Sequence, residues 1–319
     1  MKQRLKGNAG LIALISIGLL VMAGAAIVDK EWTIALSHHR LPQLVAFMED
    51  SIFEGEPLGA NDIVIFLLLT AVVAYYAAWR WPGSGKISAL RPQTGFVLAS
   101  ALVTGIYLVH SLKWIMGRAR PDLVLGHKAA FSHWFAFGPL FVTDGVYYGS
   151  FPSGHTSQAF LLMAAAFALA GDPLAGRPVR IGGWLWAILA LVFSLAMGTA
   201  RCMTLSHWLS DILGSIFIGG ICMHLLYFKV LRVPDQRRYA DHHGRLPELP
   251  QVWELILCLH MLLETIGVMA LIIGARALWI GKSPWLVAMV PVGAVLVWVA
   301  WQKSGTLLHR VWQIMAVPE

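Results

Sequence analysis

Charged residues are scarce in this chain of 319 residues. Asp, Glu, Lys and Arg together supply only 13% of the sequence, while 58% of it is hydrophobic. A water-soluble domain carries about a quarter charged residues, so this composition excludes an ordinary soluble domain and predicts an integral membrane protein. Cysteine is scarce too. Cys202, Cys222 and Cys258 form no C-x-x-C pair and leave an odd number, which argues against a zinc site and against a disulfide framework.

The few charges sum to +7 at neutral pH. A basic chain can bind nucleic acid, but here Lys and Arg are scattered and flank apolar runs instead of forming one basic face. That distribution is typical of anchoring beside membrane spans. We therefore expect the chain to associate with the bilayer and not with nucleic acid, and its oligomeric state stays open.

Long apolar runs dominate the sequence. A helix needs about 20 apolar residues to cross a bilayer. Runs of this kind occupy residues 9–28, 62–80, 95–115, 155–171, 183–200, 207–228, 252–274 and 284–302. The first run follows a basic stretch, as in a signal peptide, but it is long and has no clear small-x-small cleavage site, so we expect an uncleaved span. The pattern predicts an all-α integral membrane protein with a six-helix transmembrane core plus about two extra C-terminal transmembrane helices.

Lys and Arg lie in alternate connections between these runs. They precede the first run, join the second to the third and the fourth to the fifth, and follow the sixth: Lys2, Arg4, Lys6, Arg80, Lys86, Arg91, Arg177, Arg180, Lys229, Arg232, Arg237, Arg238 and Arg245. The positive-inside rule makes these connections, and the N-terminus, cytoplasmic. The connection at residues 32–48 then lies on the outer side, where its mixed character predicts a segment that lies flat on the membrane.

The pattern divides the chain into three parts. We expect a six-span core at residues 1–230, with its motif-bearing part at 95–228, then a polar cytoplasmic linker at 231–250 and a two-span extension at 251–319. The extension carries Glu254, His260 and Glu264 within its first apolar run, and His260 and Glu264 have helical pairing distance. An interhelical polar pair is the common explanation; partner binding and a lateral gate stay open as alternatives.

The first charged motif joins Lys113 to Arg120. The two residues are seven apart, so one continuous helix would place both on one face, with Gly117 between them and Pro121 ending the helix. Two cations above a small residue form a plausible phosphate clamp, because arginine adds two-armed geometry. The alternative is that Lys113, Arg118 and Arg120 only reach out to water at a helix end.

The second motif is Pro152-Ser153-Gly154-His155, at the start of the fourth run. Pro and Ser favour helix starts, and Gly154 lets backbone approach a ligand closely. Free amides at such a start bind anions, and the Ser153 hydroxyl adds a donor. His155 then points into the same space and is placed to protonate a leaving oxygen. An ordinary helix start with an interfacial histidine is the alternative.

The third motif combines Arg201 with His207 and Asp211. The histidine and the aspartate are four residues apart at the start of the sixth run, so we expect them to share a helix face and to touch. A carboxylate on one imidazole nitrogen fixes the tautomer and leaves the other nitrogen as a nucleophile. Arg201 lies on the turn before and can reach a phosphate. The alternative is a buried His–Asp pair that joins helices, but three motifs on one membrane face favour a joint site.

Together these motifs resemble those of the type-2 phosphatidic acid phosphatase superfamily. Its pattern is Lys, six residues, Arg-Pro; then Pro-Ser-Gly-His; then Ser-Arg, five residues, His, three residues, Asp. The chain meets it at Lys113, Arg120, Pro121, Pro152, Ser153, Gly154, His155, Arg201, His207 and Asp211. Ala200 departs from it, because the family usually has serine there, and we expect this to cost a phosphate hydrogen bond or local positioning without abolishing activity. The resemblance covers the first six runs.

The resemblance implies a lipid phosphate or diphosphate phosphatase at the outer face of a bacterial cytoplasmic membrane. His207 would form a phosphohistidine, with Asp211 orienting it and His155 protonating the departing oxygen. Lys113, Arg120, Ser153, Gly154 and Arg201 would hold the phosphoryl oxygens. Candidate substrates are undecaprenyl diphosphate, phosphatidylglycerol phosphate, phosphatidic acid and lipid A.

No acidic cluster of metal-ligand type accompanies the motifs, so we expect turnover without a metal or other cofactor. Two alternatives remain. One is a lipid phosphotransferase that uses the same site, and the other is a non-enzymatic anion or lipid transporter.

Overall fold

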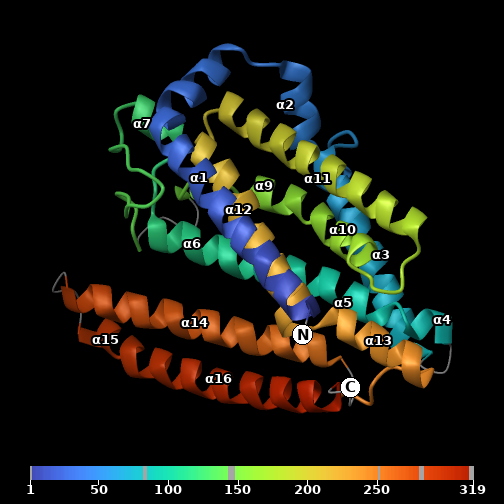
Figure 1. The fold of residues 1–319 in the computed structure, drawn as a ribbon. Coiled ribbons are helices and arrows are strands. Elements are labelled where there is room, and N and C mark those ends of the chain that lie inside the picture. Colours follow the sequence, from blue (N-terminus) through green and yellow to red (C-terminus); the bar gives the residue numbers. More distant parts are fainter. Residues whose placement is uncertain (1, 82–84, 143–147, 251, 280–283, 316–319) are drawn as a thin grey trace.

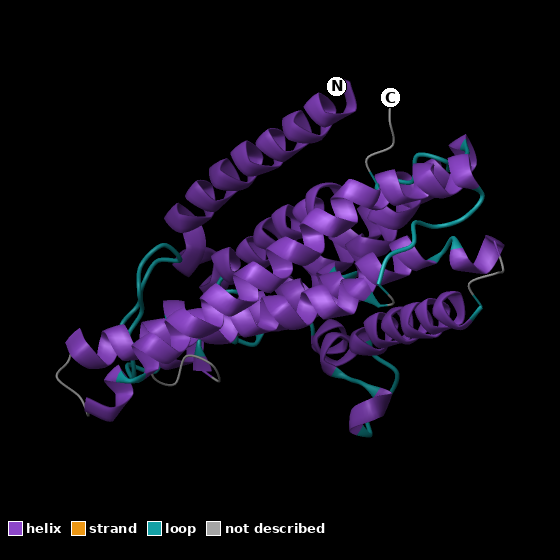
Figure 2. Cartoon of the chain, turned by 90° about the horizontal axis from the view of Figure 1, so that it is seen from below, coloured by secondary structure: helices purple, strands orange, loops and turns teal. Residues whose placement is uncertain are grey.

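The computed structural model describes residues 2–81, 85–142, 148–250, 252–279 and 284–315. Across these residues the regular elements are helices, and no strand is found. Seen from below, helices joined by short connections account for most of the chain (Figure 2). The predicted all-α integral membrane class is confirmed.

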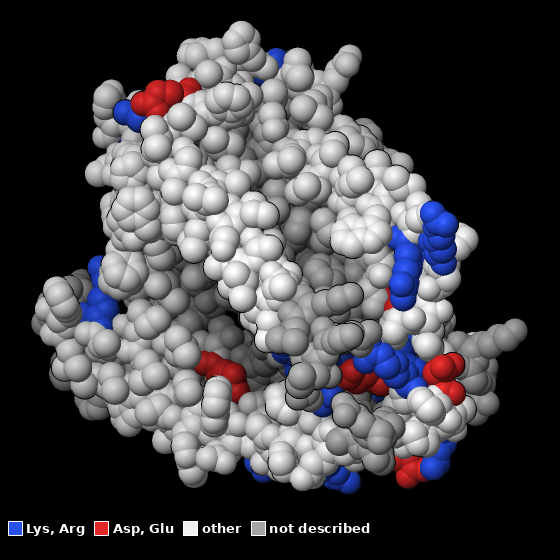
Figure 3. Space-filling view, in the orientation of Figure 1, with Lys and Arg blue, Asp and Glu red and all other residues white. Residues whose placement is uncertain are grey.

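Seven helices or helix series in the described residues are long and apolar enough to cross a membrane. They are Asn8–His38, Ala60–Arg80, Arg91–Leu125, Arg177–Met203, Leu209–His243, Trp253–Trp279 and Trp285–Ile314. The fourth predicted run, residues 155–171, coincides with the shorter apolar stretch Gly154–Ala170. The broad middle of the face in Figure 3 is largely uncharged, and Lys and Arg gather with Asp and Glu near α13 at its edge. Such a distribution fits a protein surrounded by lipid.

The first half of the chain forms the helices that carry or support the first two motifs. These are α1 (Lys2–His38), α2 (Pro42–Glu49), the short η1 (Ile52–Glu54), α3 (Ala60–Arg80), α4 (Gly85–Ser88), α5 (Arg91–Ser100), the π-helical η2 (Ala101–Leu108), α6 (Val109–Met116), α7 (Pro121–Leu125), α9 (Gly154–Phe160) and α10 (Leu162–Ala170).

The second half forms α11 (Arg177–Met203), α12 (Leu209–Leu225), η3 (Leu226–Val230), α13 (Val233–His243), α14 (Trp253–Trp279), α15 (Pro284–Val287) and α16 (Met289–Ile314). Helix α12 contacts α1, α9 and α11, and α10 packs along α11. Figure 1 shows α1 crossing α12 in the middle of the molecule.

Helices α14 and α16 form a hairpin along one side of the core (Figure 1). Glycines allow the two helices to approach closely, since a Cβ added at Gly293 would lie 2.5 Å from the carbonyl oxygen of Gly267. The hairpin joins the main apolar core through Trp253 and Leu257, which pack in the same cluster as Phe96. It is therefore an integral part of the fold and not a separate body.

The ionisable residues of α14 have separate partners. Glu254 is buried and accepts hydrogen bonds from the Tyr75 hydroxyl at 2.9 Å and from Arg91 Nη2 at 3.3 Å. Glu264 accepts a hydrogen bond of 2.8 Å from Ser304 of α16 and not from His260, which corrects the pairing expected from helical spacing. An interhelical polar contact is thus present, but the hydroxyl of the facing helix provides it.

The segment predicted as a linker contains α13. Gln236 of this helix is buried, and Arg237 forms an ion pair with Asp172 at 3.1 Å. Arg237 also donates to the carbonyl oxygen of Ala89 at 3.0 Å. These contacts tie α13 to the ends of α10 and α4, so the polar sequence forms an ordered helix against the core.

Candidate active site

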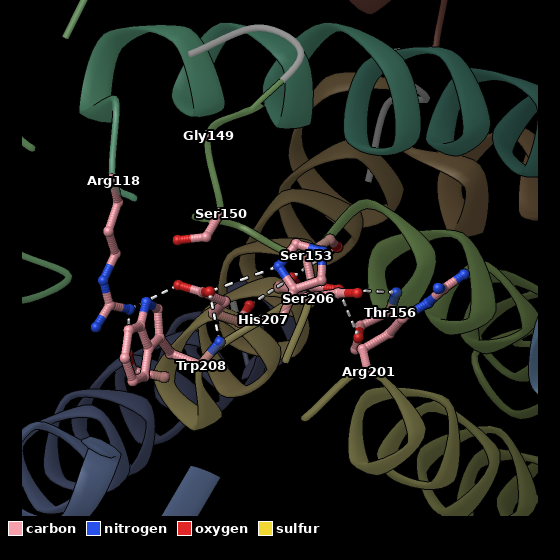
Figure 4. A network of polar contacts seen from close by, with 12 residues as sticks. Arg118, Gly149, Ser150, Ser153, Thr156, Arg201, Ser206, His207 and Trp208 are labelled. Atoms are coloured by element: carbon pink, nitrogen blue, oxygen red, sulfur yellow. Dashed lines mark hydrogen bonds and ion pairs between the residues drawn. The ribbon is translucent and has the colours of Figure 1, made fainter. Parts of the chain in front are cut away.

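The three motifs come together near the start of α12. Lys113, Arg120, Arg201 and His207 all lie close enough to His155 to interact with it electrostatically. A Cβ added at Gly154 would lie 3.8 Å from Cε of Lys113. Figure 4 shows Ser153, His207 and Arg201 close together, with Arg118 beside Trp208. Segments that are about 90 residues apart in sequence, such as the one holding Arg118 and the one holding Asp211, thus share one cluster.

Lys113 and Arg120 do not lie on one continuous helix, contrary to the prediction. Helix α6 ends at Met116, and Gly117 caps it with φ 54°, its N–H donating to the carbonyl oxygen of Lys113 at 2.9 Å. Only glycine fits here, since an added Cβ would lie 2.0 Å from the backbone nitrogen of Phe141. Arg120 has extended backbone as the N-cap of α7. Gly117 therefore redirects the chain instead of leaving room for a ligand.

The first motif still delivers its two cations to the site. Lys113 is buried, and its Nζ donates a hydrogen bond of 2.8 Å to the carbonyl oxygen of Gly149. Arg120 is half-buried and interacts electrostatically with both Lys113 and His155. Because of the turn at Gly117, one cation extends into the site from the end of α6 and the other from the start of α7.

Ser153 caps α9 and is fully buried. Its Oγ accepts hydrogen bonds from the backbone nitrogen of Thr156 at 3.4 Å and from Thr156 Oγ1 at 2.9 Å. The Ser153 N–H donates to the carbonyl oxygen of Asp211 at 3.1 Å, and Ser215 Oγ donates to the Ser153 carbonyl at 2.9 Å. These bonds fix the start of α9 against α12, and His155 is held half-buried beside it.

His207 and Asp211 meet in a different way from the one predicted. Trp208 is the N-cap of α12, so His207 precedes the helix, and Oδ2 of Asp211 accepts a 2.8 Å hydrogen bond from the Trp208 N–H. The same Oδ2 lies 3.5 Å from Nδ1 of His207, which is long for a hydrogen bond. Within the described residues, this buried Nδ1 has no hydrogen-bond partner. His207 and Asp211 are therefore brought together by the cap of α12, and they do not share a helix face.

The surroundings keep the His207 imidazole neutral. Burial lowers the pKa of His207 to about 4, and the positive charge of Lys113 acts in the same direction. The Asp211 carboxylate raises this pKa and offsets only part of the effect. At neutral pH the ring therefore has a free lone pair, which a nucleophile needs.

Arg201 is already paired with a carboxylate that the sequence analysis did not connect with the site. Its Nη1 lies 2.7 Å from Oε1 of Glu49, the last residue of α2. The Arg201 Nε is buried and lacks a hydrogen-bond partner among the described residues. Helix α2 is held in place by Val45 and Met48, which are buried in a small apolar cluster. This helix packs on α11 through one face, while Pro42, Gln43, Ala46 and Phe47 are exposed on the other.

Ala200, where the family pattern has serine, belongs to that apolar cluster. It is 1% exposed and is grouped with Val45, Met48, Met197 and Met203. A side chain in this environment contacts hydrocarbon, so a hydroxyl there would be surrounded mainly by apolar groups. The packing of α2 thus gives a physical reason for alanine at this position.

Arg118 is the second feature missed from the sequence, where it was grouped with residues that reach out to water. It is fully buried, and its guanidinium forms ion pairs of 2.6 Å with Asp211 and 2.6 Å with Asp29 of α1. The ring of Trp208 lies 5.5 Å from the guanidinium carbon. The available signal was Asp29 itself, because an acidic residue at the end of an apolar run needs a partner.

Within the described residues, no group of three or more His, Cys, Asp or Glu side chains is arranged to hold a metal ion. The arrangement instead offers cations, a neutral imidazole backed by a carboxylate, and a second histidine. These groups suit the chemistry of an anionic phosphorus centre, in which positioning and electrostatic stabilisation do most of the work.

Comparison with known proteins gives one family. The family model described as the PAP2 superfamily matches residues 94–233. This stretch contains all three motifs, from Lys113 to Asp211, and it excludes the α14–α16 hairpin. No curated protein and no solved structure matches the chain.

Proposed function

Because residues 94–233 match the family model of the PAP2 superfamily, whose members are phosphatases, we propose that this protein is a membrane-embedded lipid phosphatase. The observation that carries the proposal is the buried, neutral His207 beside Asp211, in a cluster that also holds His155 and the cations Lys113, Arg120 and Arg201. A site that only binds an anion needs neither a nucleophile nor an acid.

In the proposed mechanism, Nε2 of His207 attacks phosphorus in line with the departing oxygen. The phosphorus–nitrogen bond forms as the bond to the lipid oxygen breaks, and His155 gives that oxygen a proton. Asp211 holds the Nδ1 side of the imidazole and stabilises the positive charge that develops on the ring. Water then attacks the phosphohistidine, gives its proton to His155, and releases inorganic phosphate.

The proposed phosphate cradle consists of Lys113, Arg120 and Arg201 with the Ser153–Gly154 turn. Two of these cations have partners that a phosphate would replace: the Gly149 carbonyl for Lys113 and the Glu49 carboxylate for Arg201. A phosphate oxygen is a stronger partner for a cation than a neutral carbonyl. Binding at Lys113 therefore exchanges a hydrogen bond to a neutral carbonyl for a charge-assisted one, and binding at Arg201 exchanges the Glu49 carboxylate for the phosphate.

The setting supports a lipid as the substrate class. The site lies among helices long and apolar enough to cross a membrane, so a phosphate carried by a lipid can reach it from the bilayer. We propose undecaprenyl diphosphate, phosphatidylglycerol phosphate, phosphatidic acid or lipid A as substrate, hydrolysed without metal at the outer face of a bacterial inner membrane. The distribution of Lys and Arg supports that orientation.

The test is release of inorganic phosphate by purified protein in detergent, with a chelator and without added metal. The four lipids are compared in parallel, and His207→Ala is the matched variant. Release from one lipid is expected, with a loss of more than about a thousandfold in His207→Ala, because removal of a nucleophile leaves only binding and electrostatic contributions. Near-normal turnover in His207→Ala, or dependence on added magnesium, would contradict the mechanism.

Two alternatives are separated by the products. A phosphotransferase using the same site would move the phosphoryl group to a lipid hydroxyl, so a phosphorylated acceptor would replace free phosphate. A transporter would form no covalent intermediate. Trapping radiolabelled phosphate on His207, detected as an alkali-stable phosphohistidine, would exclude simple transport.

A further inference from the structure

A buried chain of charges leads away from the candidate nucleophile. Arg118 lies in the turn between α6 and α7, Asp29 lies on α1, and Asp211 lies on α12. The Arg118 Nη1 is 2.6 Å from Oδ1 of Asp211, and its Nη2 is 2.6 Å from Oδ2 of Asp29. The side-chain exposures of Arg118, Asp29 and Asp211 are 0%, 1% and 0%.

Every oxygen of the two carboxylates has a defined neighbour. Oδ1 of Asp211 accepts a hydrogen bond from Arg118, while Oδ2 accepts one from the Trp208 N–H and faces His207. Asp29 accepts from the Ser210 N–H at 2.9 Å through Oδ1, and from Ser210 Oγ at 2.6 Å through Oδ2. Arg118 therefore fixes the rotation of the Asp211 carboxylate, and Asp29 fixes Arg118.

The charges of this chain do not cancel. One guanidinium between two carboxylates leaves a formal charge of −1 beside His207. If Asp29 were neutral, Arg118 would balance Asp211 alone and weaken its attraction for a positively charged imidazole. Buried ion pairs are expensive to form and do not by themselves favour a fold over apolar packing, so this arrangement is poorly explained by stability alone.

We propose that Asp29 and Arg118 are positioning residues for the phosphatase reaction, acting on His207 through Asp211. Arg118 holds the carboxylate in the orientation that faces Nδ1, and Asp29 preserves the negative charge that stabilises the imidazole as it becomes positive. This role rests on the proposed function, because it has meaning only if His207 attacks phosphorus. Neither residue contacts the substrate in this scheme.

The main test is Asp29→Asn, which keeps the shape of the side chain and removes its charge. Steady-state phosphate release is measured with the lipid that the unsubstituted protein hydrolyses fastest. Outer partners of an active-site group typically contribute about 10- to 100-fold to activity. We expect kcat to fall at least about tenfold with KM nearly unchanged.

Asp62→Asn is the matched control. Asp62 is also a fully buried carboxylate, and it accepts hydrogen bonds from Ser51 Oγ at 2.6 Å and from the Gly59 N–H at 2.9 Å. Its role is to cap α3, so its substitution should lower thermal stability and leave kcat unchanged. Loss of kcat in both variants to the same extent would show a general structural effect and overturn the proposal.

A double substitution tests the route of the effect. If Asp29 acts through Asp211, then adding Asp29→Asn to Asp211→Asn should reduce kcat by less than about twofold more, because the carboxylate through which it acts is already neutral. Independent multiplication of the two losses would overturn the proposal. Radiolabelled substrate gives the sensitivity that the slow Asp211→Asn background requires.

Should Asp29→Asn not fold, Ser210→Ala gives a second test. Its hydroxyl donates to Asp29 and accepts a 2.7 Å hydrogen bond from Arg118, and its removal retains every charge. We expect kcat to fall about threefold at constant KM, as for one lost hydrogen bond, and an unchanged kcat would overturn the positioning role.

If the unsubstituted protein releases no phosphate, the proposed function itself fails. An active protein whose Asp29→Asn variant keeps full kcat overturns only this inference.

Discussion

Two clusters of charge lie near opposite ends of the Leu209–His243 helical series, and they differ in how completely their arginines are paired. In the Asp172 cluster, Arg237 contacts the Asp172 carboxylate through both Nε and Nη2, at 3.2 and 3.1 Å from Oδ2. Gln93 and the Leu174 N–H complete the hydrogen bonds of that carboxylate. The cluster joins α5, α10 and α13, and its geometry is that of a structural tie.

The cluster around Asp211 contains unused hydrogen-bonding capacity. His207 Nδ1 and Arg201 Nε are buried without hydrogen-bond partners among the described residues. The cations Lys113, Arg118, Arg120 and Arg201 gather here with the acidic side chains of Asp29, Asp211, Glu49 and Glu54. The two clusters can therefore be distinguished by how completely their arginines are paired, and the one with an unused arginine donor is suited to an anionic ligand.

Substitution of Arg201 should show the largest difference between the two clusters. Arg201→Gln should lower kcat/KM by about 100-fold or more, because it removes a charge-assisted donor to the phosphoryl group. The measurement is phosphate release at several lipid concentrations, with thermal unfolding as the check that the fold is intact. Retention of normal kcat/KM would remove Arg201 from the phosphate cradle.

A change of pH should affect the Asp211 cluster through the titration of His207. Neutral His207 is the form that attacks, so protonation of this ring should lower kcat/KM only as the pH falls through about 4. The unfolded chain binds the proton near pH 6.5, so His207 also contributes stability that is lost as the pH falls from there through about 4. A loss of kcat/KM on acidification that is centred near pH 6.5 would contradict a buried, neutral nucleophile.

Arg237→Gln should act on stability and leave catalysis intact. The pair with Asp172 is mostly buried, with side-chain exposures of 16% and 11%, so its loss should cost about 1–3 kcal/mol. Thermal unfolding in detergent measures the cost, and kcat of the folded fraction should stay within about twofold of the original. A large fall in kcat at unchanged stability would reverse the roles assigned to the two clusters.

Glu49→Gln alters the balance within the candidate site. Because the carboxylate occupies Arg201 at 2.7 Å, its neutralisation should strengthen inhibition by inorganic phosphate about three- to tenfold, the effect of roughly 1 kcal/mol. Asp50→Asn, at the neighbouring position just after α2, is the control and should not change inhibition. Equal inhibition in Glu49→Gln and the original protein would mean that the ion pair does not compete with phosphate.

Ala200→Ser should have the smallest effect. The added hydroxyl would lie among Val45, Met48 and Met197, where it can still bond to the carbonyl one turn earlier in α11. We expect a loss of at most about 1 kcal/mol in stability and less than about threefold in kcat. A gain in kcat of tenfold or more would indicate that the hydroxyl reaches the phosphate, and that the apolar contact is not what excludes serine here.

The membrane-spanning runs and the three motifs were predictable because each depends on local sequence. Span length follows from bilayer thickness, and the motifs are short, charged and placed at the ends of apolar runs. The turn at Gly117 was not predicted, because helical spacing between Lys113 and Arg120 says nothing about the 138–141 segment that packs against Gly117. That contact leaves no room for a Cβ at Gly117, whose φ is 54°.

The partners of the motif residues were the least predictable part. Arg118 pairs with Asp29 and Arg201 pairs with Glu49, across separations of 89 and 152 residues. Such contacts depend on how α1 and α2 pack, which no local pattern reports. The same holds for Glu264, where helical spacing suggested His260 while the facing helix supplied Ser304.

The contact between Arg91 and Glu254 also has a consequence for biosynthesis. Arg91 is made 163 residues before Glu254, so its guanidinium and the Tyr75 hydroxyl must wait at the edge of the nascent bundle. Hydration can satisfy them there until the α14–α16 hairpin inserts and brings its carboxylate. Completion of the last two long helices thus gives the polar groups of α3 and α5 a shared carboxylate partner, and a chain that ends before residue 254 lacks it.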